Sequence, residues 1–129
     1  MKKDIESRED LERMLRAFYE KVFTDDLISH FFIEVVPLDL AHHLPVITDF
    51  WESVLLNGRD YRRNVMQLHI DIHKLSPIHK EHLDRWVQLF TQTVDAFFEG
   101  DKATLAKQRA LSIATLMDIK MNHTNERRL

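Results

Sequence analysis

The stretch SREDLERMLRAFYEKV, residues 7–22, predicts the fold class of this chain. Ser7 followed three residues later by Asp10 is typical of a helix N-terminus, where side chains bind backbone N–H groups that the helix leaves unpaired. Behind this cap, large apolar residues recur every three or four positions, which is the period of an α-helix with one buried face. We therefore expect an amphipathic helix that breaks around residues 24–26. Its apolar residues are Leu11, Met14, Leu15, Phe18 and Val22.

The following segments continue the helical pattern. A short apolar stretch, residues 27–36, ends at Pro37. Asp39 then supplies an N-cap for a helix that Asn57-Gly58 is expected to end. Residues 59–75 show no sustained period, so we expect a loop with one or two helical turns there. The apolar stripe of the helix after Asp39 consists of Leu40, Leu44, Ile47, Phe50, Trp51, Val54 and Leu55.

Two more helices are expected in the C-terminal half of the chain. Ser76-Pro77 is a strong start signal, with Ser at the N-cap and Pro at the first helical position, and Gly100 is expected to end the helix that follows. Asp101 is expected to cap the last helix. The inner residues are Leu83, Trp86, Val87, Phe90, Val94 and Phe97 in the first of these helices, and Ala106, Ala110, Ile113, Met117 and Met121 in the second.

The composition agrees with an all-α fold, in one domain spanning residues 1–129. Two glycines and three prolines in 129 residues are too few for the many tight turns of a β-rich protein. The formal net charge of −3 offers no reason to expect nucleic acid or an anionic membrane as a partner. The absence of cysteine excludes disulfides and thiolate ligands. With no secretory signal and no apolar run of ~18 residues, we expect a cytoplasmic protein.

The eight histidines differ in their surroundings. His43 precedes Leu44 on the edge of an apolar stripe, so it is expected to face the core or a cavity. On this pattern alone, a hydrogen-bonded core histidine is favoured over a ligand-binding one. Four others lie near helix ends or among polar residues and are expected to be exposed. These are His30, His79, His82 and His123.

His69 and His73 are four residues apart and share one face if their segment is helical. That spacing suits a metal site, but no set of carboxylates accompanies it to complete a zinc or di-iron centre. His69 lies between Leu68 and Ile70, which is an apolar setting. A single imidazole in an apolar wall suits haem, because the porphyrin supplies four nitrogens and the protein needs to supply only one axial ligand.

Tyr19 and Trp86 add polar groups to the expected core. Tyr19 follows Leu15 by four residues, so its ring is expected at the inner edge of the first helix. Trp86 lies on the inner stripe of its own helix and brings an indole N–H donor. Taken singly, each is explained as a core aromatic residue with a locally satisfied polar tip. Together with His43, they bring three polar groups into one core, which is unusual for a core that binds no ligand.

At this point the chain resembles the truncated haemoglobins, and most closely their group III. The similarity extends from about Ile5 to Met121, and the order and spacing of its elements are more specific than any one of them. The matching elements are Ala17-Phe18-Tyr19-Glu20-Lys21-Val22, Phe31-Phe32, His42-His43-Leu44-Pro45, Asp49-Phe50-Trp51, Tyr61 with His69, His82-Leu83-Asp84-Arg85-Trp86 with Leu89-Phe90, and the stretch from Thr93-Val94-Asp95 to Phe98-Glu99-Gly100.

The resemblance implies a truncated two-over-two globin fold around a haem pocket, with haem b as the cofactor. It makes His69 the proximal iron ligand. It places Tyr19 and Trp86 on the distal side as donors to a bound ligand, and His43 there as a gate or a contact. Ile47 is expected to line the pocket and Phe32 to pack against the porphyrin. Cations near the proximal loop are candidates for binding the haem propionates, namely Arg62, Arg63 and Lys74.

The function implied is binding of dioxygen at a five-coordinate iron, with carbon monoxide, nitric oxide or cyanide as other iron ligands. Oxygen transport is one use of such a site. Strong polar stabilisation of the ligand favours redox chemistry instead, either oxidation of nitric oxide or reduction of peroxide, and this would require an unidentified reductase. Two alternatives stay open on the residues alone: a helical bundle with a non-haem metal site on His69 and His73, and a ligand-free helical interaction module.

Overall fold

The first helix of the computed structural model, α1, spans Arg8–Thr24, as the N-terminal pattern predicts. The structure describes residues 2–35, 37–56 and 76–123. The hydroxyl of Ser7 accepts the backbone N–H of Asp10 at 3.2 Å, which confirms the predicted cap. The predicted inner face is confirmed as well, because all of its members are buried: Leu11, Met14, Leu15, Phe18 and Val22.

The short apolar stretch forms a π-helical turn, η1 (Phe31–Val35), and leads into α2 (Leu40–Leu55). The Asp39 carboxylate accepts the backbone N–H of Ala41 at 3.1 Å, so Asp39 is the N-cap that the sequence predicts. The expected stop at Asn57-Gly58 lies outside the described residues. Thr48 is buried in the core although it is polar, and its hydroxyl donates to the carbonyl of Leu44 at 2.7 Å.

The third long helix, α4 (Lys80–Phe97), begins later than the sequence predicts. Its N-cap is His79 and not Ser76, so the helix start predicted from Ser76-Pro77 was wrong by three residues. The physical reason is a different cap: the backbone N–H of His79 donates to Nδ1 of His82 at 2.9 Å. Ile78, just before this cap, is buried in the core.

The last long helix, α5 (Asp101–Asp118), continues into a π-helical turn, η2 (Ile119–His123). The predicted cap at Asp101 was wrong, because Gly100 is the N-cap and Asp101 is the first helical residue. The carboxylate that binds the free N–H groups belongs to Asp4, which accepts from Lys102 and Ala103, each at 2.9 Å. A residue from the start of the chain therefore caps its last helix.

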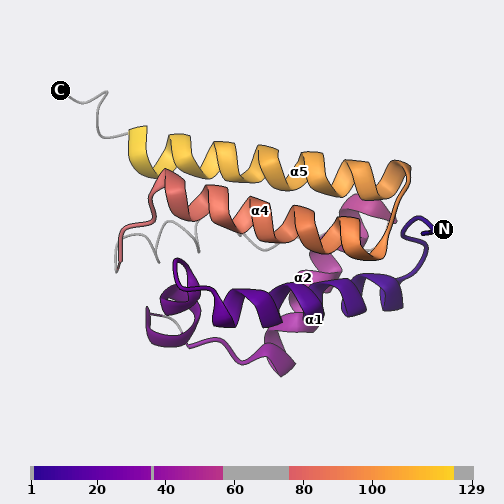
Figure 1. The fold of residues 1–129 in the computed structure, drawn as a ribbon, viewed down its shortest axis with the longest axis horizontal. Helices are drawn as coiled ribbons and strands as arrows, with labels where there is room; N and C mark the ends of the chain where they lie inside the picture. The colour runs from indigo at the N-terminus through magenta and orange to yellow at the C-terminus, as the bar shows by residue number, and fades with distance from the viewer. Residues whose placement is uncertain (1, 36, 57–75, 124–129) are drawn as a thin grey trace.

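The helices are arranged as two contacting pairs, one laid over the other (Figure 1). One pair is α1 with α2, which crosses behind α1 in this view, and the other is α4 with α5, which run side by side. Contacts of α1 with α4 and of α2 with α5 join the two pairs. This all-α arrangement is the two-over-two layout expected from the sequence. Within the described ranges, no helix has the length and apolar character that crossing a bilayer requires.

Aromatic rings fill the space between the two pairs. The ring of Trp51 from α2 stacks on that of Phe90 from α4 with centroids 4.9 Å apart. Phe18 from α1 meets the same Phe90 ring edge-on at 5.4 Å. Burial of such large side chains is the main favourable contribution to folding. Phe90 therefore connects three helices at the centre of the core.

Candidate functional site

The hydroxyl of Tyr19 on α1 and Nε2 of His43 on α2 are 2.9 Å apart and form a hydrogen bond. Tyr19 is 5% exposed, whereas His43 is half-buried. Burial raises the pKa of Tyr19 well above its usual value of 10, because the phenolate would lose its hydration. Tyr19 is therefore a neutral phenol, and its proton is available for hydrogen bonding. His43 faces inward, as the sequence predicts.

Other aromatic side chains surround the Tyr19 ring. The ring of Phe32 from η1 lies 6.2 Å away in an edge-to-face arrangement, and that of His43 lies 5.2 Å away. Phe23, one turn after Tyr19 on α1, lies 6.5 Å away. The sequence reasoning missed Phe23, although its spacing of four residues from Tyr19 places both side chains on one helix face. Three elements thus bring their aromatic residues together around one hydroxyl.

Trp86 joins this group through Phe18. The Phe18 ring is in edge contact with Tyr19 at 5.1 Å and with Trp86 at 6.1 Å. Trp86 is half-buried, and its indole N–H donates no hydrogen bond to any residue that the structure describes. Ile47 lies one turn after His43 on α2 and is also half-buried against the core. The predicted distal residues therefore come from α1, η1, α2 and α4 toward one part of the core.

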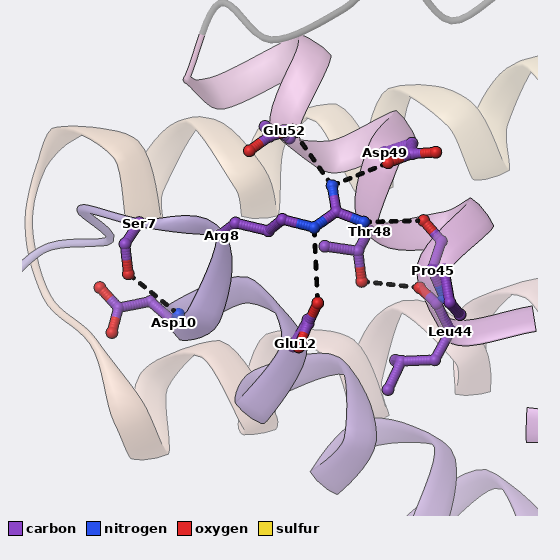
Figure 2. A network of polar contacts seen from close by, with 9 residues as sticks. All are labelled: Ser7, Arg8, Asp10, Glu12, Leu44, Pro45, Thr48, Asp49 and Glu52. Carbon is purple, nitrogen blue, oxygen red and sulfur yellow. Dashed lines mark hydrogen bonds and ion pairs between the residues drawn. The ribbon is translucent and has the colours of Figure 1, made fainter. Parts of the chain in front are cut away.

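A network centred on Arg8 holds α2 in place beside α1 (Figure 2). The guanidinium donates to Asp49 at 2.7 Å, to Glu52 at 3.1 Å and to the carbonyl of Pro45 at 3.4 Å, all on α2. It also pairs with Glu12 of its own helix. Because Arg8 and Tyr19 lie on one helix, these contacts help to set the position of α2, and with it His43, relative to Tyr19.

A second histidine group lies at the start of α4. His82 packs edge-on against Phe31 at 5.0 Å, with the His79 ring 5.6 Å away. His30 and His82 are half-buried, so the prediction that they are exposed was wrong, whereas His79 is exposed as predicted. Burial, together with the nearby His79 and His30, lowers the pKa of His82 despite an opposing effect of Glu81. The side chain of His123 lies outside what the structure describes.

The predicted proximal residues all fall within residues 57–75, outside the described part of the chain. They are the proposed iron ligand His69, its neighbour His73, and the propionate candidates Arg62, Arg63 and Lys74. Among the residues that are described, no three histidines, aspartates or glutamates gather closely enough to hold a metal ion. The alternative site on His69 and His73 likewise involves only residues outside the described ranges.

The described residues fit one side of a haem. Such a group needs a largely apolar wall with few, well-placed polar groups. Phe32, Ile47 and Trp86 supply apolar surface that packs on the core without being fully buried. Tyr19 and His43 supply hydroxyl and imidazole groups already held by a hydrogen bond.

Comparison with known proteins agrees with this arrangement. No family model matches the chain. The "Group 3 truncated hemoglobin ctb" of Campylobacter jejuni is 26% identical over 118 residues, which covers 89% of this chain and 91% of that protein. The crystal structure of a group III truncated haemoglobin from Campylobacter jejuni superimposes with a TM-score of 0.80 at 26% identity, over 94% of this chain and 95% of that one. The chain is therefore similar in sequence to a group III truncated haemoglobin, and it has the all-α fold of the truncated globins.

Proposed function

We propose that the chain is a haem globin that binds dioxygen and other diatomic gases, with His69 as the proximal ligand and Tyr19 and Trp86 as distal hydrogen-bond donors. The observation that supports this most directly is the 2.9 Å hydrogen bond between the buried Tyr19 hydroxyl and His43. Even when they satisfy each other, two polar groups stabilise a core little more than apolar side chains of the same shape would, so a ligand is a better reason than packing for having this pair there. We propose haem b as the cofactor.

Haem, when bound, supplies an iron with an open coordination position for a diatomic gas. The chain's own contribution is to direct the hydroxyl proton of Tyr19 toward the bound ligand. If Nε2 of His43 carries its proton, it donates to the Tyr19 oxygen, and the Tyr19 O–H is directed to another acceptor. If Nε2 is unprotonated, Tyr19 donates to it instead. The tautomer of His43 therefore decides whether the Tyr19 proton is available to a ligand.

Trp86 is the second donor in this proposal. Its indole N–H has no hydrogen-bond partner among the described residues, so it can donate without first breaking a bond. A net hydrogen bond contributes about 1 kcal/mol, and more toward a charged acceptor. Since about 1.4 kcal/mol corresponds to a factor of ten, two donors would slow ligand release by one or more orders of magnitude. Slow release favours oxidation of nitric oxide or reduction of peroxide over oxygen transport, with a reductase to be identified.

Haemin titration of the His69→Ala variant tests the proposal, with His42→Ala as the control. His42 is a strongly exposed histidine on α2, next to His43, so its loss removes an imidazole without touching the core. We expect wild type and His42→Ala to bind haemin with the same Soret band. His69→Ala is expected to lose stable binding while circular dichroism shows that the helices persist.

A Soret band unchanged in His69→Ala would overturn the ligand assignment. A colourless purified protein that holds another metal would favour a non-haem site on His69 and His73. A melting temperature that neither haemin nor divalent metals raise would favour a ligand-free interaction module, because any ligand of the native state must stabilise it.

A further inference from the structure

The outer face of α5 carries most of the exposed large apolar side chains of this structure. Five such side chains are exposed among the described residues, and four of them lie on α5 or on the first residue after it. Leu111 is 58% exposed and Leu116 is 46% exposed. The fifth, Ile33, belongs to η1, far from α5 in the sequence, and is 52% exposed. The four on α5 and its extension are Leu105, Leu111, Leu116 and Ile119.

The inner face of α5 shows the opposite composition. The side chains that α5 buries most deeply over its first four turns are alanines, at positions 103, 106, 110 and 114. Small residues allow the backbones of packed helices to approach closely. Of the larger apolar residues of this helix, Ile113 and Met117 pack on the core, whereas its three leucines are exposed. An amphipathic helix that packs only inside its own domain normally has the reverse distribution.

Three of the exposed apolar residues lie on one narrow stripe. Leu105, Ser112 and Ile119 are spaced by seven residues, and Leu116 lies close to the same line on a helix with 3.6 residues per turn. Exposed positions between residues 104 and 119 carry a single charge, that of Arg109. Charged exposed residues occur at the two ends, Asp101 and Lys120. An uncharged centre with a charged border is typical of a protein interface.

We propose that this outer face of α5 is a homodimer interface, in which two copies of the helix pack antiparallel about a two-fold axis near Ser112. Leu105 and Ile119 lie at equal distances on either side of Ser112, so the axis places Leu105 of one copy against Ile119 of the other. The same axis sets Arg109 opposite Thr115. Like charges are therefore not apposed at the centre.

The charges at the ends of the helix are the reason to choose a second copy as the partner. Asp101 is at the N-terminal end of α5 and Lys120 follows its C-terminal end, so antiparallel pairing brings opposite charges near each other at both ends. Their distances from the axis differ by about 4.5 Å along the helix, at 1.5 Å per residue, which a lysine side chain spans. Antiparallel helix dipoles add to this preference. The interface does not depend on the proposed haem site.

The size of the surface predicts a reversible dimer. The stripe from Leu105 to Ile119 is about 21 Å long, at 1.5 Å per residue. One helix face of this length buries an area at the low end for specific interfaces. We expect wild-type protein, as purified with its cofactor, to pass from monomer to dimer between about 1 µM and about 1 mM in sedimentation velocity runs. Leu116→Glu is expected to weaken association at least tenfold. Ile33→Glu, an equally exposed apolar residue on another element, is expected to leave it unchanged.

A charge exchange tests the antiparallel arrangement. Asp101→Lys alone and Lys120→Asp alone are each expected to weaken dimerisation, and the double variant is expected to restore it. Circular dichroism of each variant shows whether the fold is retained. A wild type that is monomeric at every concentration would overturn the proposal. The outer face of α5 would then be a candidate interface for a different protein. A dimer insensitive to Leu116→Glu, or a double variant no better than the single ones, would overturn it equally.

Discussion

The hydroxyl of Tyr19 and the imidazole of His43, which are 24 positions apart in the chain, meet at 2.9 Å and so connect α1 to α2 inside the molecule. The contact has two consequences. It satisfies a phenol that burial keeps neutral, and it holds a titratable imidazole beside the proposed ligand pocket. The Arg8 network, at the beginning of α1, supports the same pair of helices from the outside.

Tyr19→Phe removes the hydroxyl and keeps the ring that packs against Phe18. On the proposed function, the dioxygen dissociation rate of the reduced protein is expected to rise about tenfold, because a donor to the ligand is lost. Stopped-flow displacement by carbon monoxide measures this rate. Thr115→Val, which removes an exposed hydroxyl on α5, is the control and is expected to have no effect. Equal rates for both variants would exclude Tyr19 as a donor to the ligand.

Arg8→Ala breaks the network between α1 and α2. Since the Arg8 side chain is 31% exposed, its ion pairs are screened by water, and we expect a loss of about 1 kcal/mol in the free energy of unfolding. This corresponds to a fall of about 4 °C in the melting temperature. Arg16→Ala, an exposed arginine on the same helix, is the control. High salt is expected to reduce the difference between wild type and Arg8→Ala, and a salt-independent difference would contradict the electrostatic explanation.

Gly100→Ala is expected to destabilise the protein by more than about 1 kcal/mol, for two reasons. Gly100 has φ = +146°, which residues with a side chain rarely adopt. A Cβ atom there would also lie 2.5 Å from Cγ of Asp4. Chemical denaturation measures the loss in the free energy of unfolding. Glu99→Ala, a change at the exposed residue before Gly100, is the control.

The double variant Asp4→Ala with Gly100→Ala tests the steric part of this loss. Asp4→Ala alone is expected to cost about 1 kcal/mol, because it removes the cap of α5. In the double variant the conflicts with Cγ and Oδ2 of Asp4 disappear, whereas the close approach to the Cβ of residue 4, at 2.7 Å, and the backbone strain are left. The double loss is therefore expected to be smaller than the sum of the single losses. Additive losses would contradict the contact between these two residues.

His82 makes the stability of the start of α4 depend on pH. Its Nδ1 accepts the backbone N–H of His79 only while the imidazole is neutral. Because burial lowers the pKa of His82 below its ordinary value of 6.5, the folded state favours the neutral form. This contribution to stability is complete above pH 6.5 and is lost as the pH falls through the lower pKa of the folded state.

His82→Asn keeps a side chain that can accept a hydrogen bond but removes the titration. Urea denaturation midpoints between neutral pH and about pH 5 are expected to fall less steeply for this variant than for wild type. Parallel curves for the two proteins would show that His82 does not contribute to the pH dependence. A pKa of His82 measured above 6.5 by NMR would contradict the sign of the effect.

The elements that the sequence predicted correctly are those decided by neighbours in the chain. The caps at Ser7 and Asp39 each bind an N–H within three residues, and a helical period needs only local spacing. The resemblance then indicated both the fold and the distal pair of Tyr19 and His43. The positions of His69 and of the propionate candidates are still predictions.

One prediction that was wrong depends on a contact between distant residues. Asp4 caps α5 across 98 positions of the chain, and this cap replaced the local one expected from Asp101. Another concerns the start of α4, where His82 binds the N–H of His79, three residues earlier, and so offers a second local cap beyond Ser76-Pro77. The packing of His82 on Phe31 is the long-range part of this difference. Local patterns do not show which of two possible caps the packed structure selects, nor which distant side chain binds a backbone N–H.

By itself, then, the sequence determined that this chain is helical, where two of its helices begin and which family it resembles, because these properties follow from local spacing and from motif order. Only the tertiary structure decided that Tyr19 and His43 share a hydrogen bond, that the first residues of the chain cap the last helix, and that α5 turns alanines inward and leucines outward. The physical reason is that each of these features depends on how separate helices pack, and packing selects among contacts that the local sequence permits equally.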